Sequence, residues 1–189
     1  MEEMLEKVRQ FAEAAHGEQR RKYAPEKYIE HPVRVMELCK LYDQSPAVLA
    51  TALLHDVLED TSVTRDEIAR FLFNVMDGRE AAKTIAMVVE LTNVYTRENY
   101  PRLQRRKRKR KEAERLGTIS SGAQTIKYAD IIDNCRGISV DDPDFAPVFL
   151  KECKTALTAM TKGNARLREK ALYTIQYEKI MLNDALINS

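Results

Sequence analysis

Residues 51–61 read TALLHDVLEDT, with four ionisable side chains in a largely apolar stretch. At about 100° per residue, a helix brings those four side chains within an arc of about 140°, while the leucines and the valine point mostly elsewhere. The four are His55, Asp56, Glu59 and Asp60. The spacing predicts a helix of the core with one polar face, which either meets solvent or holds a divalent cation.

Helical signals continue on both sides of this stretch. Apolar residues recur at helical spacing between Met4 and Ala15, and no segment alternates with period two. Ser45-Pro46 is typical of a helix cap followed by a first-turn proline, so the helix that carries His55 should begin there. Other helices are expected from residue 32, from 64, and over 79–91, 101–117, 124–135, 147–161 and 165–186. The sequence predicts an all-α bundle, with residues 1–189 forming a single domain.

Two segments have the spacing of a capping box, in which a hydroxyl and an acid or amide three residues later satisfy free backbone N–H groups. Thr64 precedes Glu67, and Ser121 precedes Gln124. Each pair is expected to begin a helix.

Composition and the N-terminal residues indicate where in the cell the protein is expected. Of the 189 residues, 32% are charged and 44% are hydrophobic, as in a soluble globular protein. The first four residues include two acids and no apolar signal core, so we expect a cytoplasmic protein without a membrane segment. The cysteines, Cys39, Cys135 and Cys153, are odd in number and lack CxxC spacing, which favours reduced core thiols.

Two further residues are candidate metal ligands. His31 directly precedes Pro32, at the expected start of a helix, where its ring could point inward or simply cap the helix. Asp130 lies in an apolar helical segment, and a buried carboxylate needs a partner. That partner is Lys127, three residues earlier, a neighbouring arginine, or a metal ion. With His55 and Asp56 these residues make a set of two imidazoles and two carboxylates, which suits Mn²⁺ or Fe²⁺ better than a closed zinc site.

Five sequence blocks follow one another in the order seen in a known family. They are HGEQRRK (16–22), YIEHP (28–32), TALLHDVLEDT (51–61), ELT (90–92) and IKYADIIDN (126–134). In these blocks the chain resembles the HD superfamily of metal-dependent phosphohydrolases. More narrowly, it resembles the hydrolase domain of the RelA/SpoT family and the stand-alone small alarmone hydrolases. The resemblance implies a single helical HD domain.

The resemblance also implies a reaction, which is removal of the 3′-pyrophosphate from guanosine tetra- or pentaphosphate with Mn²⁺ as cofactor. By position, His31, His55, Asp56 and Asp130 would hold the metal, and Glu59 and Asp60 would position and deprotonate the attacking water. The residues expected beside the nucleotide are Arg21, Lys22, Asn134 and Arg136.

Two other functions stay open. The chain could hydrolyse another nucleotide, such as an adenosine alarmone or a nucleotide phosphate monoester, or it could be a catalytically silent nucleotide-binding module. Departures from the family pattern, such as Glu18 and Ile131, lie in segments expected near the nucleotide, so the base preference is open. The expected partner is a nucleotide polyphosphate, and the sequence leaves the oligomeric state undetermined.

Residues 102–111 form a strongly basic run, with eight lysines or arginines among ten residues in a chain whose formal net charge is +2. Three interpretations compete. The run is a solvated helix face paired with Glu112 and Glu114, a positive surface that steers a polyphosphate substrate, or a nucleic-acid patch. Nucleic acid is not expected as a partner, because no aromatic residues are interleaved for base stacking.

Overall fold

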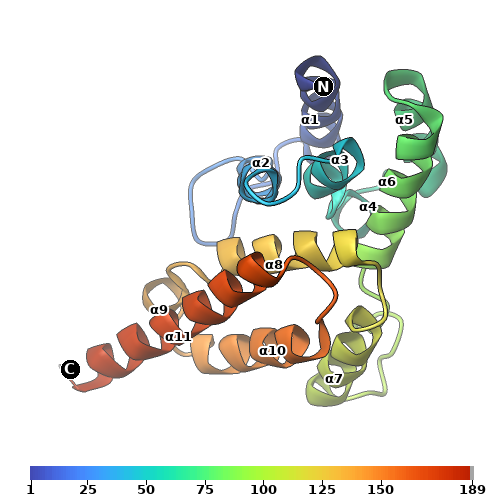
Figure 1. The fold of residues 1–189 in the computed structure, drawn as a ribbon. Helices are drawn as coiled ribbons and strands as arrows, with labels where there is room; N and C mark the ends of the chain where they lie inside the picture. The colour runs from blue at the N-terminus through green and yellow to red at the C-terminus, as the bar shows by residue number, and fades with distance from the viewer. Residues whose placement is uncertain (188–189) are drawn as a thin grey trace. The chain divides into compact units, whose positions relative to one another are not determined.

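The computed structural model describes residues 1–187, which form helices joined by turns (Figure 1). Within these residues, extended pairing is limited to one isolated bridge between Arg20 and Lys27. No helix in the described part is long and apolar enough to cross a membrane. The expectation of an all-α fold is confirmed.

The helices belong to two compact units, the first ending at Thr92 and the second beginning at Asn93. The first unit contains α1 (Glu2–His16), α2 (Glu30–Lys40), α3 (Pro46–Leu54), α4 (Val57–Asp60), α5 (Arg65–Val75) and α6 (Gly78–Leu91). The second contains α7 (Arg105–Leu116), α8 (Ser121–Cys135), α9 (Ile138–Asp141), α10 (Ala146–Ala159) and α11 (Ala165–Ile187). That residues 1–189 form a single domain stays a prediction.

Helix α3 is the centre of the first unit. Every residue from Ala47 to Leu54 is buried, as expected of a helix that is apolar on all sides, and α1, α2 and α6 pack against it. The Ser45 hydroxyl accepts a hydrogen bond from the Val48 N–H at 3.3 Å, and Pro46 occupies the first turn. The predicted start of this helix is confirmed.

The prediction that this helix continues through Asp60 is wrong. Helix α3 ends at Leu54, and the separate turn α4 begins after Asp56. The His55 ring donates from Nδ1 to the Ala52 carbonyl at 2.8 Å, the group that would accept the Asp56 N–H in a continuing helix. This side-chain bond ends α3 at the first residue of the polar set.

Other helix ends also differ from expectation. Helix α2 begins at Glu30, so His31 lies inside it rather than ahead of it. Helix α7 begins at Arg105, because Pro101 lies in a preceding turn. The short helices α4 and α9 were not expected.

One of the two predicted capping boxes forms. Thr64 and Glu67 satisfy each other's backbone N–H groups at the start of α5. At α8 the cap is Ser120, not Ser121. The Gln124 side chain is occupied elsewhere, donating to the Leu116 carbonyl at 3.0 Å and accepting from the Lys162 N–H at 2.7 Å.

Helix α8 is the buried centre of the second unit, and α11 lies along it, whereas α10 packs mainly against α7 and α11 (Figure 1). The Tyr128 ring is fully buried, and its hydroxyl donates to the Met160 carbonyl at 2.9 Å. The turn before α11 brings Gly163 so close that an added Cβ would lie 2.5 Å from Tyr128 Cε2 and 2.8 Å from the Thr125 nitrogen. The chain therefore needs glycine at this position.

We expect Gly163→Ala to destabilise the protein by about 1–3 kcal/mol, because backbone and a buried ring must move to admit the methyl group. For a chain of this size that lowers Tm by about 2–4 °C for each kcal/mol, measured by circular dichroism. Gly78→Ala is the control, since its added Cβ would meet nothing closer than Phe73 Cε1 at 3.7 Å. Equal Tm values for the two variants would contradict this account.

Candidate metal centre and active site

Three side chains of the first unit converge on one point. The ligand atoms of His31, His55 and Asp56 all lie within 4.8 Å of one another. Asp56 Oδ2 is 3.5 Å from His31 Nε2 and 3.2 Å from His55 Nε2. Both histidines are buried: 0% of the surface of His31 and 2% of the surface of His55 is exposed. Asp56 is half-buried. The packing of α2 on α3 produces this cluster, since α2 carries His31 and His55 directly follows the last residue of α3.

The hydrogen bond that ends α3 also prepares the His55 ring for a cation. A carbonyl oxygen can only accept, so the bond to Ala52 places the proton of the neutral ring on Nδ1. The lone pair is then on Nε2, the nitrogen that faces Asp56. A backbone carbonyl that fixes the ring in this way is the usual support of a metal-binding histidine.

This donor set fits a divalent cation. Two imidazole nitrogens and one carboxylate oxygen suit a borderline metal ion, and three ligands leave coordination positions for water and substrate. The structure thus brings together three of the four expected ligands. The fourth, Asp130, belongs to the second unit, and its part in metal binding stays a prediction.

The two acids expected to handle water lie in α4, directly after the cluster. Asp60 Oδ2 accepts a hydrogen bond from the Tyr28 hydroxyl at 2.9 Å, and the same hydroxyl is 2.7 Å from Asp56 Oδ2. Partial burial of its carboxylate, and then the Asp56 charge, raise the pKa of Asp60 above its usual value. Glu59 and Asp60 both keep exposed surface. The Tyr28 hydroxyl ties Asp60 to the cluster.

Tyr28 was not among the expected site residues. Burial, and then the nearby Asp56 charge, raise the pKa of Tyr28 above its usual value, so its hydroxyl stays a proton donor. The sequence held a signal for it, because Tyr28 precedes His31 by three residues and the two therefore share a side of the helix start. The rings of these residues meet edge to face with centroids 5.9 Å apart.

Of the residues expected at the nucleotide, Arg21 and Lys22 belong to the first unit. The Arg21 guanidinium lies over the Tyr28 ring, 5.9 Å from its centroid. The Lys22 ammonium donates to the Tyr23 hydroxyl at 2.5 Å. Arg21 is thus linked to the cluster through Tyr28.

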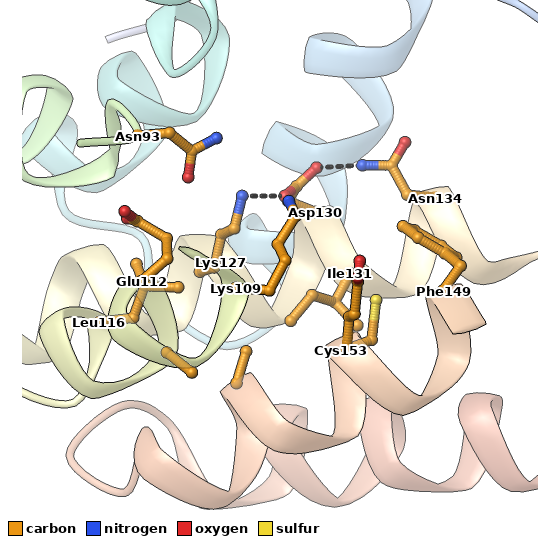
Figure 2. A pocket seen from close by; sticks show the side chains of 13 residues that line it. Asn93, Lys109, Glu112, Leu116, Lys127, Asp130, Ile131, Asn134, Phe149 and Cys153 are labelled. Carbon is orange, nitrogen blue, oxygen red and sulfur yellow. Dashed lines mark hydrogen bonds and ion pairs between the residues drawn. The ribbon is translucent and has the colours of Figure 1, made fainter. Parts of the chain in front are cut away.

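In the second unit, Asp130 lies between two hydrogen-bonding partners on its own helix (Figure 2). Lys127 Nζ is 2.7 Å from Asp130 Oδ2, and the Asn134 amide donates to Asp130 Oδ1 at 2.5 Å. The Lys127 pairing considered from the sequence is therefore present. It neutralises a buried carboxylate that a cation would otherwise need to balance.

These three residues line a pocket of about 130 Å³ within the second unit. Its remaining wall combines charged groups, Lys109, Glu112 and Glu152, with an apolar surface that includes Phe149 and Ile131 (Figure 2). Arg136, at the C-terminal end of α8, is exposed. Cys39, Cys135 and Cys153 are free and buried, as the sequence predicted.

Comparison with known proteins places this geometry in a family. Residues 28–135 match the HD domain family. The guanosine-3′,5′-bis(diphosphate) 3′-pyrophosphohydrolase MESH1 of Drosophila melanogaster is 32% identical over 140 residues, which cover 71% of this chain and 69% of that protein. The human MESH1 protein is 34% identical over 138 residues, with the same coverage.

A solved structure has the same fold. It is described as a metazoan ortholog of SpoT that hydrolyses ppGpp, and it aligns with a TM-score of 0.75 over 92% of this chain and 94% of that one. Sequence identity in the alignment is 24%, so this comparison establishes the fold alone. The family match and the MESH1 relatives show that the chain belongs to the HD-domain family.

Proposed function

We propose that this protein is a metal-dependent hydrolase that removes the 3′-pyrophosphate from guanosine tetra- or pentaphosphate, releasing GDP or GTP and pyrophosphate. The observation that carries the proposal is the buried cluster of His31, His55 and Asp56 with the Asp60 carboxylate tied beside it. The relatives named as 3′-pyrophosphohydrolases support the substrate. A cytoplasmic location goes with this activity and stays a prediction.

In this proposal His31, His55 and Asp56 hold the cation, with Asp130 as the fourth ligand on the strength of its sequence motif. We propose Mn²⁺ as the metal. When bound, the cation supplies Lewis acidity that stabilises negative charge on the reacting phosphate. Neutral imidazoles and ionised carboxylates are the forms that bind it, and the hydrogen bond from His55 to Ala52 keeps one ring in that form.

The other residues of the proposed site act on water and nucleotide. Asp60 and Glu59 orient the attacking water and take its proton as the bond to phosphorus forms. Arg21 and Lys22 bind substrate phosphates, because guanidinium and ammonium groups pair with phosphate oxygens. Asn134 and Arg136 approach the nucleoside.

Metal-loaded protein should release pyrophosphate from guanosine tetraphosphate faster than from the adenosine analogue or a nucleotide monophosphate, as measured by a pyrophosphate assay. Chelation should abolish release and added Mn²⁺ should restore it, because the cluster is completed by a cation. His55→Ala should lose metal, measured by elemental analysis, and activity together. Asp66→Asn, which removes an exposed acid of α5, is the control and should retain both.

Two results would reject parts of this proposal. Faster pyrophosphate release from the adenosine substrate would support the same reaction but make adenine, not guanine, the preferred base. Normal metal content without hydrolysis of any nucleotide would favour the silent binding module.

Glu59→Gln, and separately Asp60→Asn, should lower kcat by about 10²–10⁴-fold, the usual contribution of a general base. Metal content should stay near that of the unchanged protein, because neither carboxylate belongs to the cluster of ligand atoms. Steady-state kinetics at saturating Mn²⁺ measures kcat, and elemental analysis measures the metal content. Loss of metal in either variant would make that residue a ligand instead.

The basic run offers a separate test. Several of its cations are engaged within the second unit: Arg105 forms two hydrogen bonds with Glu152, at 2.8 Å each, and Arg110 is 3.6 Å from Glu114. Arg106 and Lys107 are exposed, and within residues 1–187 neither side chain forms a hydrogen bond or ion pair. These two adjacent charges are therefore free to attract a polyphosphate.

Replacing Arg106 and Lys107 together by Gln should lower kcat/KM at low salt, and the loss should shrink as ionic strength rises, because screening removes long-range attraction. Lys151→Gln with Lys154→Gln is the matched control, removing two exposed charges from α10. Kinetics over a series of salt concentrations checks this. Unchanged kcat/KM would favour a solvated face, and salt-dependent binding of nucleic acid would favour the third interpretation.

A further inference from the structure

Tyr28, which was not expected from the sequence, contacts several residues of the candidate active site. Its hydroxyl is 2.7 Å from Asp56 Oδ2 and 2.9 Å from Asp60 Oδ2. A phenol has one proton to donate, so this hydroxyl binds the two carboxylates at a shared point. It thereby links a residue of the metal cluster to the acid proposed to act on water.

The ring of Tyr28 makes contacts of its own. The Arg21 guanidinium lies over it at 5.9 Å, and the ring of His16 packs against it with centroids 4.5 Å apart. An aromatic face attracts a guanidinium group, so the ring helps to hold Arg21 in place. One side chain thus fixes both an acid and a cation of the proposed site.

A second set of bonds holds the backbone of α4. The Gln19 amide donates to the Asp60 carbonyl at 2.7 Å, and its oxygen is 2.8 Å from His16 Nδ1. The Tyr28 N–H donates to the Gln19 carbonyl at 2.9 Å. The end of α1 and the segment before α2 are therefore tied both to each other and to Asp60.

These ties compensate for the weakness of α4. It is a helix of four residues, too short to be stable by itself, and its last residue carries the Asp60 carboxylate. Without the bonds from Gln19 and Tyr28, that carboxylate would sample other rotamers, and small displacements of a catalytic group are costly.

We propose that Tyr28 is a positioning residue, which holds the Asp60 carboxylate against Asp56 through its hydroxyl and Arg21 through its ring, with His16 and Gln19 fixing the α4 backbone. The inference rests on the proposed function, because it assigns Tyr28 a part in the same reaction. It also makes a claim that is independent of the substrate, since the hydroxyl bonds directly to a residue of the metal cluster.

The central test is Tyr28→Phe, which removes the hydroxyl and keeps the ring. A hydrogen bond to a charged group is worth about tenfold to a hundredfold, so kcat at saturating Mn²⁺ should fall by that factor. KM should change less than about threefold, since the ring that contacts Arg21 remains. Calorimetric titration should show Mn²⁺ binding weakened by about tenfold at unchanged stoichiometry, as is usual when a bond to a metal ligand is lost.

A double-mutant cycle separates positioning from a general loss of structure. If Tyr28 acts through Asp60, the pair Tyr28→Phe with Asp60→Asn should have the kcat of Asp60→Asn alone. Tyr28→Leu should in addition raise KM, because Arg21 loses the ring. Tyr177→Phe, which alters an exposed tyrosine of α11, should match the unchanged protein in every measurement.

Unchanged kcat and unchanged Mn²⁺ affinity in Tyr28→Phe would overturn the inference, and so would additive losses in the cycle. Failure of the proposed function looks different. In that case the unchanged protein binds Mn²⁺ but releases no pyrophosphate, and the Mn²⁺ affinity of Tyr28→Phe still decides whether the hydroxyl supports Asp56.

Discussion

The burial of α3 is the constraint on which the first unit depends. A helix that is apolar on all sides must be enclosed, and α1, α2 and α6 enclose it. Its last turn therefore delivers His55 into the interior, where an imidazole must have partners. Nδ1 finds one in the Ala52 carbonyl, and that bond ends the helix. The same packing that stabilises the unit thus gives the ring its orientation and its protonation.

Negative charge next to this ring needs compensation. Asp56 and Asp60 would repel each other at the distance that a shared hydrogen-bond donor imposes. The Tyr28 hydroxyl, which donates to this pair of carboxylates, offsets part of that repulsion. In the second unit, Lys127 and Asn134 do the same for Asp130. Both units therefore place hydrogen-bond donors beside their buried or partly buried acids.

The sequence predicted the helical class and the convergence of His31, His55 and Asp56, because helical periodicity and the scarcity of histidine are local signals. It failed where a side chain bonded to backbone outside the expected pattern. His55 ended a helix that the apolar spacing continued, and Gln124 bound the turn before α8 instead of completing a capping box. Tyr28 was overlooked because its spacing from His31 indicates a shared side of the helix start but not where the hydroxyl lies. The role of Asp130 still rests on its motif.

Helix α7 shows how a sequence can depend on its surroundings to fold. Residues 105–111 are seven successive cations, which repel one another in an isolated helix. The helix is held by acids at its edges: Glu112 accepts from the Val94 and Tyr95 N–H groups and pairs with Arg115, and Glu152 of α10 binds Arg105. Glu152 follows α7 in the sequence, so it is synthesised and leaves the ribosome after α7. This helix should therefore form late, once α10 has emerged to meet it.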